Sequence, residues 1–323
     1  MKLYFLNVGY GEAIVARSDS GYTVVIDGGP RHTAEAEPDA IALDEFLRRE
    51  SCKRIDLVIL THIHDDHISG LVPVVEGWDV GEIWCNITPN YEIAPALERL
   101  RPHLGKRPGS LLFWRALQSY ECIRTIAQQQ GIPLRSVCGG ETYQLGGLTL
   151  TLYGMHSDAQ RENQQQFERM LATSEPEVLF KRFDESDCIC NSTSLALTIG
   201  EGDFRALLTG DKVHGWDILR RECDLQAAVL KITHHGQLDG MPQDMLEGAD
   251  PEIIVTCVDR KRTFYGGNPV VLDRAAAYFR TKSREPRIFM TGALREQAPY
   301  GSVLELSWDR KTKRTNSLVK TYE

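Results

Sequence analysis

The chain has 323 residues, of which 42% are hydrophobic and 25% charged, and this balance excludes disordered, collagen-like and coiled-coil proteins. The net charge is −8, yet residues 260–323 hold 14 Lys and Arg against 6 Asp and Glu. The acidic body argues against a broad nucleic-acid-binding surface. The basic C-terminal region is either a local phosphate-binding strip or a solvated surface.

Apolar runs in the sequence are strand-sized, and none approaches the roughly 18 residues of a membrane-spanning helix. Polar residues interrupt the apolar start of the chain, which is unlike a secretory signal. The eight cysteines are too sparse for a disulfide scaffold. We therefore expect a cytoplasmic protein with reduced thiols and no membrane partner.

The first half of the chain begins with short β-branched and aromatic runs, which predict antiparallel strands at 3–8, 13–16 and 22–26. A helical pattern over 39–50 leads into 55–60, a continuous apolar strand of the kind buried on both faces of a sheet.

The later elements alternate between helices and strands. Helical periodicity is predicted over 111–130 and 270–279, with one helix indicated inside the polar stretch 157–187. Strands are predicted at 149–153, 195–199, 204–208, 228–232, 253–257, 288–290, 303–306 and 318–322. We interpret residues 1–323 as a single domain with insertions at about 101–140 and 157–187.

Three histidines and two aspartates follow the strand 55–60 in one loop, which reads Thr61-His62-Ile63-His64-Asp65-Asp66-His67. Imidazoles and carboxylates at this spacing can hold two neighbouring cations, His62 and His64 one, Asp66 and His67 the other. The alternative is a solvent-exposed polar loop. Two further strand ends carry metal-ligand side chains, namely Asp211 and the pair His234-His235. Each could be a surface feature by itself, but their coincidence with the 61–67 loop favours a metal site.

These motifs make the chain resemble the metallo-beta-lactamase superfamily, through THIHDDH at 61–67, LLTGD at 207–211 and THHG at 233–236. Within that superfamily it is most similar to the metallo-hydrolase domain of the DNA-uptake competence protein ComEC. That similarity lies in LNVGYGEAIVAR, VVIDGG, NSTSLALTIGEGDFRALLTGD, LKITHHG and TGALREQAPYGSVLEL. The resemblance implies an α/β fold, namely a four-layer αββα sandwich of mixed sheets with helices outside and the metals at one sheet edge.

The resemblance also implies two divalent metal ions, with zinc as the first choice and manganese or iron as alternatives. It assigns His62 and His64 to one metal, Asp66, His67 and His235 to the other, and Asp211 to both. Asp27 would orient a ligating imidazole from behind. His234 would contact the substrate or assist the leaving group, unless the two adjacent histidines exchange roles.

The chain departs from the superfamily pattern at two places. Many superfamily members carry a further histidine ligand where this chain has Asn191 and Ser192. ComEC-like chains have the same Asn-Ser sequence there. We expect these two residues to contact substrate. His156 is then the best candidate for the missing imidazole, with an ordinary loop histidine as the alternative. Asn268 lies where ComEC-like chains tend to have histidine, and we place it on the substrate side.

The expected activity is hydrolysis by a hydroxide that two metals activate, with Asp66, Asp211 and His234 as catalytic residues. The leading hypothesis is a phosphodiesterase or nuclease acting on nucleic acid or nucleotides. A lactonase or esterase acting on a small substrate is one alternative. A metal-binding sensor or partner-binding module without catalysis is another.

Overall fold

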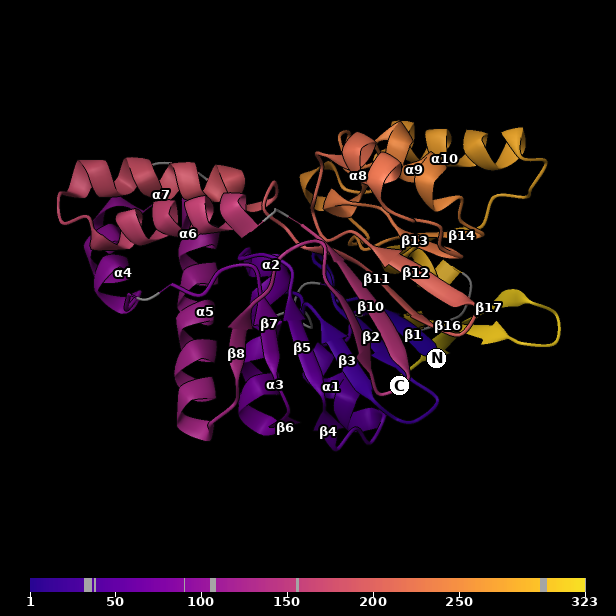
Figure 1. The fold of residues 1–323 in the computed structure, drawn as a ribbon, viewed down its shortest axis with the longest axis horizontal. Helices are drawn as coiled ribbons and strands as arrows, with labels where there is room; N and C mark the ends of the chain where they lie inside the picture. Colours follow the sequence, from indigo (N-terminus) through magenta and orange to yellow (C-terminus); the bar gives the residue numbers. More distant parts are fainter. Residues whose placement is uncertain are drawn as a thin grey trace.

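The computed structural model describes residues 1–31, 37, 39–89, 91–104, 109–154, 157–296 and 301–322. Its strands form two large mixed sheets and one small pair, β4 (Arg54–Ile55) with β6 (Asp79–Val80). Figure 1 shows the two large sheets facing one another, with helices outside them. The predicted four-layer αββα arrangement is therefore confirmed.

The first sheet has eight strands and begins with an antiparallel half that the chain termini build. Its last four strands, β3, β5, β7 and β8, run parallel. In spatial order the strands are β17 (Arg314–Thr321), β16 (Gly301–Asp309), β1 (Lys2–Leu6), β2 (Ile14–Arg17), β3 (Thr23–Ile26), β5 (Leu57–Leu60), β7 (Ile83–Cys85) and β8 (Leu134–Ser136).

The second sheet has seven strands, parallel from β12 to β15 and antiparallel from β9 to β12. In spatial order they are β15 (Ile288–Met290), β14 (Ile253–Thr256), β13 (Val229–Lys231), β12 (Phe204–Leu208), β11 (Ala196–Glu201), β10 (Leu148–Tyr153) and β9 (Thr142–Leu145).

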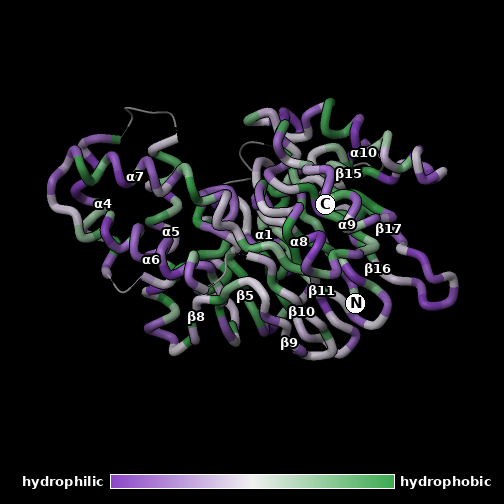
Figure 2. Tube along the Cα trace, turned by 45° about the horizontal axis from the view of Figure 1, so that its top comes forward, coloured by the Kyte–Doolittle hydropathy of each residue, from purple (hydrophilic) through white to green (hydrophobic). Residues whose placement is uncertain are grey.

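Strand β5 shows why the sheets pack as they do. Successive side chains of a strand point to opposite faces, so Leu57 and Ile59 join the core between the two sheets, whereas Val58 and Leu60 face the helices. All four are buried, which is the continuous apolar pattern that the sequence predicted for this strand. Figure 2 shows hydrophobic segments gathered where the sheets meet and hydrophilic ones along the outer helices and the β16–β17 loop.

Helices cover the outer face of each sheet. Those beside the first sheet are α1 (Leu43–Arg49), α2 (Asp65–Ile68), α3 (Val72–Gly77), α4 (Ala94–Leu100), α5 (Ser110–Gln130), α6 (Ser157–Ala172) and α7 (Pro176–Cys190). Those over the second sheet are α8 (Trp216–Glu222), α9 (Gln243–Ala249) and α10 (Pro269–Thr281). Short 3-10 turns lie at Ser69–Leu71, Arg101–His103, His234–Gly236, Thr263–Tyr265 and Thr291–Glu296. No helix in the described part of the chain is both long and apolar enough to cross a bilayer.

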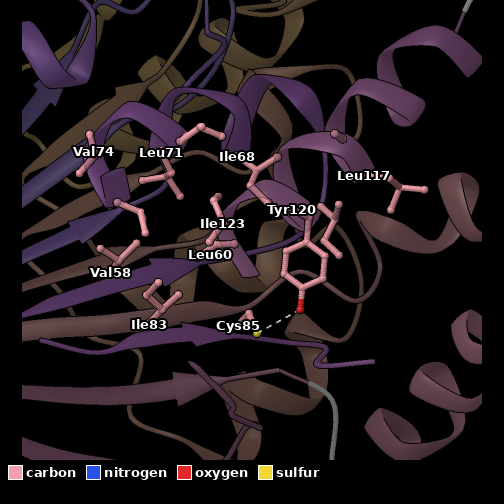
Figure 3. Close-up of a cluster of buried hydrophobic side chains, with 14 of the residues drawn as sticks. Val58, Leu60, Ile68, Leu71, Val74, Ile83, Cys85, Leu117, Tyr120 and Ile123 are labelled. Atoms are coloured by element: carbon pink, nitrogen blue, oxygen red, sulfur yellow. Dashed lines mark hydrogen bonds between the residues drawn. The ribbon is translucent and has the colours of Figure 1, made fainter. Parts of the chain in front are cut away.

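The core beneath α2, α3 and α5 holds the loop 61–67 in place. Figure 3 shows Leu60 and Ile83 of the sheet facing Ile68 of α2, Leu71 of the turn Ser69–Leu71 and Ile123 of α5. Tyr120 of α5 extends toward the sheet, where its hydroxyl lies 3.8 Å from the Cys85 sulfur. Because α2 begins one residue after His64, this packing fixes the direction in which the loop leaves β5.

The helices of the predicted insertions pack against one another, and Figure 1 shows α4 to α7 as one group at the end of the first sheet. The polar stretch 157–187 forms two helices, α6 and α7, where the sequence indicated one. Pro176 occupies the first position of α7, where proline favours a helix start. Residues 173–175 therefore separate two helices.

Candidate metal centre

The predicted ligands lie at the carboxyl ends of parallel strands in both sheets. Asp27 directly follows β3, the loop 61–67 follows β5, Asp211 lies just after β12, and His234 and His235 lie just after β13. Because β3 pairs in parallel with β5, and β12 with β13, each sheet presents these residues at one edge. The sandwich brings the two edges together.

Three sets of ligand atoms converge there, each within 4.8 Å. His62, His67 and Asp211 form one set, and Asp66, His67 and His235 form another. The third set adds Glu12 to Asp211 and His235. All of these residues except Asp66 are buried, and the shared members make the sets overlap.

Asp211 lies at the middle of this cluster. Its Oδ2 is 3.4 Å from Nε2 of His67, 3.5 Å from Nε2 of His235 and 4.0 Å from Nε2 of His62. Its Oδ1 has no hydrogen-bond partner among the described residues. Gly210 allows this approach, since its φ is +48° and a Cβ there would lie 2.4 Å from the Ser194 hydroxyl.

Hydrogen bonds from behind turn the imidazole Nε2 atoms toward the cluster. Asp27 Oδ2 accepts from Nδ1 of His67 at 2.7 Å, and the Asp27 carboxylate also accepts from the amide and hydroxyl of Thr61. The Cys257 carbonyl accepts from Nδ1 of His235 at 2.8 Å. Such partners fix the tautomer and direction of ligating histidines. Asp27 thus lies behind both His67 and Thr61.

The charges of the cluster fit a cation. Burial lowers the pKa of His67, but the carboxylates of Asp211, Asp66 and Asp27 raise it well above its ordinary value. Burial likewise raises the pKa of Asp211, but the imidazoles of His235 and His67 lower it well below its ordinary value. Converging imidazole nitrogens and carboxylate oxygens, one of them unpartnered, form a donor set suited to a divalent ion such as zinc. The residues present therefore fit the metals that the fold family implies.

His64 belongs to none of the three sets. Its Nδ1 lies 3.1 Å from Nε2 of His62, and its Nε2 lies 3.2 Å from a carboxylate oxygen of Asp187 on α7. Burial lowers the pKa of His64, but Asp187, Cys190 and Asp66 together raise it well above its ordinary value. The helical insertion thus reaches the candidate site through Asp187.

His234 faces the open side of the cluster. Its Nε2 lies 3.1 Å from the Asn191 amide nitrogen, and its Nδ1 lies 3.0 Å from the Asp239 carboxylate. Ser192 lies beside Asn191 in the turn between α7 and β11. Asn268 instead caps α10, where its side-chain oxygen accepts from the Val270 amide, and His156 lies outside the described residues.

Sequence reasoning missed a buried ion pair beneath Asp211. Lys231, the last residue of β13, pairs with Glu12, and both side chains are fully buried. The Lys231 ammonium also donates to the Gly210 carbonyl at 2.8 Å and lies 3.7 Å from Asp211 Oδ1. Burial lowers the pKa of Lys231, but Glu12 and Asp211 raise it above its ordinary value. The position of Lys231 inside the otherwise apolar strand 228–232 was the sequence feature that could have indicated this ion pair.

A pocket of about 480 Å³ opens above the cluster. Polar residues that include Asp66, Asp211 and His234 line one part of it. Tyr10, Leu112, Phe113, Phe264 and Tyr265 line the rest, and Asn191 and Asp187 reach it from α7 and its C-terminal turn. The described residues that line it include no lysine or arginine.

Comparisons with known proteins bear on this geometry. The profile of the metallo-beta-lactamase superfamily matches residues 6–156, and no curated protein matches. Among similar solved structures, the diiron beta-hydroxylase CmlA from Streptomyces venezuelae is 12% identical, with a TM-score of 0.45 over 88% of this chain and 52% of that one. This chain therefore spans about half the length of CmlA.

Two further solved structures are similar over most of both chains. Zinc-bound PqqB from Methylobacterium extorquens is 11% identical, with a TM-score of 0.46 over 89% of this chain and 97% of that one. A diphosphatase of the PhnP family is 14% identical, with a TM-score of 0.38 over 79% and 85%. The profile covers just under half of this chain, and together with the αββα fold it makes the chain similar to the metallo-beta-lactamase superfamily.

Proposed function

We propose that this protein is a phosphodiesterase that uses two divalent metal ions, zinc in the first instance. The observation that carries the proposal is the set of overlapping ligand groups around Asp211, His67 and His235 at the floor of one pocket. Overlapping sets suit two neighbouring cations, and paired cations favour the negatively charged transition state of phosphoryl chemistry.

We assign His62 to one cation, and Asp66 and His235 to the other. His67 and Asp211 lie close enough to serve either cation. His64 lies beside His62. His156 stays a proposed further ligand. When bound, the metals supply Lewis acidity that activates water and polarises the scissile bond. The chain's own part is to hold these side chains from behind, through Asp27 and the Cys257 carbonyl.

We assign proton transfer to the leaving group to His234. Asp239 accepts from Nδ1 of this imidazole in one tautomer, which leaves Nε2 to exchange a proton with a group in the pocket. Asn191 lies 3.1 Å from that Nε2 and would position the same part of the substrate. Ser192 and Asn268 stay proposed as substrate-side residues. Asp66 and Asp211 complete the proposed catalytic set.

One observation favours a second candidate, an esterase or lactonase acting on a small neutral substrate. The pocket walls are largely apolar, and the described residues that line them include no lysine or arginine. A neutral ester needs no such cation. The binding of long nucleic acid, by contrast, depends on Lys and Arg contacts along the phosphate backbone.

Rates on bis-p-nitrophenyl phosphate and p-nitrophenyl acetate, with zinc- or manganese-loaded protein, separate the two candidates. The proposal expects phosphodiester cleavage that Asp211→Ala abolishes and Asp217→Ala leaves unchanged, because Asp217 is an exposed residue of α8. Ester cleavage alone by fully loaded protein would establish the second candidate. Less than one bound metal per chain after loading would instead indicate a sensor or partner-binding module.

A further inference from the structure

The mouth of the pocket carries exposed aromatic rings. Phe264 and Tyr265, in the turn Thr263–Tyr265 before α10, are 50% and 84% exposed. Both line the pocket, together with Tyr10. The Tyr10 ring lies between the loop and the metal centre, because its centroid is 4.9 Å from that of Phe264 and 5.2 Å from that of His235. The aromatic surface is therefore continuous from solvent to a ligating imidazole.

The backbone of this turn is strained in order to present the rings. Arg262, Phe264 and Tyr265 have φ values of +54°, +51° and +64°, and this left-handed backbone is unfavourable for non-glycine residues. Asp259 holds the turn, since its carboxylate accepts from the amide and hydroxyl of Thr263. Glycine adopts positive φ values more easily than these residues do. Non-glycine residues in such conformations cluster at ligand-binding sites.

The same turn is tied to the metal centre by main-chain hydrogen bonds. The Gly267 amide donates to the His235 carbonyl at 2.8 Å, and the Asn268 amide donates to the Gly236 carbonyl at 2.9 Å. The backbone that follows the rings is therefore tied to the backbone of the ligand cluster. A planar group stacked on the rings would lie beside the scissile bond of a substrate bound above Asp211.

Charge limits what that group can be. Four aspartates line the pocket, and two of them, Asp66 and Asp211, belong to the ligand cluster. No described lining residue is a lysine or arginine, so the pocket offers a phosphate little cationic balance besides the metals. A ligand with one phosphodiester and one uncharged planar ring fits this pocket, because the phosphodiester can lie at the metals and the ring at the aromatic side chains. A long polyanion would leave its other phosphates without compensating charge.

We infer that Phe264 and Tyr265 form a stacking platform for the nucleobase of a small nucleoside phosphodiester, which places the base beside the scissile bond. This inference rests on the proposed phosphodiesterase function and adds the substrate class to it. Base–aromatic stacking tolerates any base, because every base has a π-face. The platform therefore selects for a base without selecting which base.

The test compares adenosine 5′-monophosphate with ribose 5-phosphate, which carries the same phosphate without the base. Calorimetric titration of zinc-loaded protein should show the nucleotide binding about 5- to 150-fold more tightly, the range of one base stack. Phe264→Leu should remove most of this difference and Phe264→Tyr should keep it. Leu318→Ala, at an exposed residue of β17, should leave it unchanged.

Tyr265→Leu provides a second variant, because a side chain that is 84% exposed contributes little to folding. Equal affinity for the two ligands in the unsubstituted protein would overturn the inference, as would a preference that survives both leucine variants. Bis-p-nitrophenyl phosphate cleavage without any base preference refutes the platform alone. A base preference that the leucine variants abolish, in a protein that cleaves no phosphodiester, supports the platform and refutes the proposed activity.

Discussion

Replacing Lys231 by methionine tests how the fold supports the ligand cluster. The change keeps the length of the side chain and removes its charge, so Glu12 loses its partner in a fully buried position. Apart from Lys231, neither Glu12 oxygen has a hydrogen-bond partner among the described residues. Breaking a buried ion pair from one side costs about 3–5 kcal/mol. We expect the free energy of unfolding of the metal-free protein to fall by that amount.

Urea unfolding followed by circular dichroism, in the presence of a chelator, measures this loss. The matched control is Lys181→Met, whose partner Glu185 is exposed, and we expect it to cost less than about 1 kcal/mol. Glu12→Met combined with Lys231→Met should recover much of the stability, because neither side then leaves a buried charge. A loss below about 1 kcal/mol for Lys231→Met alone would refute the reasoning, as would a double variant less stable than both single ones.

The remaining predictions concern the metal, the leaving group and pH. Addition of zinc should raise the unfolding temperature, by the equivalent of about 2.7 kcal/mol at 100 times the dissociation constant, and a chelator should reverse the rise; no shift would contradict metal binding to the native state. His234→Ala should slow phosphodiester cleavage about 10²- to 10⁴-fold while metal content, measured by mass spectrometry, stays close to that of the unsubstituted protein; equal metal loss in His234→Ala and Asp211→Ala would reject the assigned roles. Burial raises the pKa of Glu50, but hydrogen bonds from Lys320 and Tyr322 lower it below its ordinary value. The ionised Glu50 therefore stabilises the folded state above about pH 4.3, and this contribution disappears as the pH falls through the lowered pKa. Urea unfolding at pH 6 and pH 3 should therefore show a smaller loss for Glu50→Gln than for the unsubstituted protein, and identical losses would contradict this.

Local patterns predicted most strands of the two large sheets, but β7, β8 and β9 were not among them. The continuous apolar run 55–60 indicated a strand buried on both faces, and the structure places Leu57 and Val58 in different cores. The resemblance to the metallo-beta-lactamase superfamily implied that the metals lie at one sheet edge, and the parallel pairs β3–β5 and β12–β13 bring the candidate ligands to such an edge.

Contacts between distant segments could not be predicted in this way. Asp187 approaches His64 only because α7 folds back over the loop from the insertion, and no periodicity encodes that return. The Glu12–Lys231 pair joins residues far apart in sequence through the packing of the two sheets. The aromatic surface of Tyr10 and Phe264 arises in the same way. Residue types near strand ends are visible in a sequence, whereas their partners from other elements depend on the tertiary fold.

Metal stoichiometry tests the central claim most directly. The account predicts about two zinc ions per chain after loading and dialysis, measured by inductively coupled plasma mass spectrometry. It predicts loss of bound metal in Asp211→Ala, because this carboxylate belongs to two of the three ligand sets, and no loss in Asp217→Ala. Unchanged metal content in Asp211→Ala, or no metal bound by the unsubstituted protein, would contradict it.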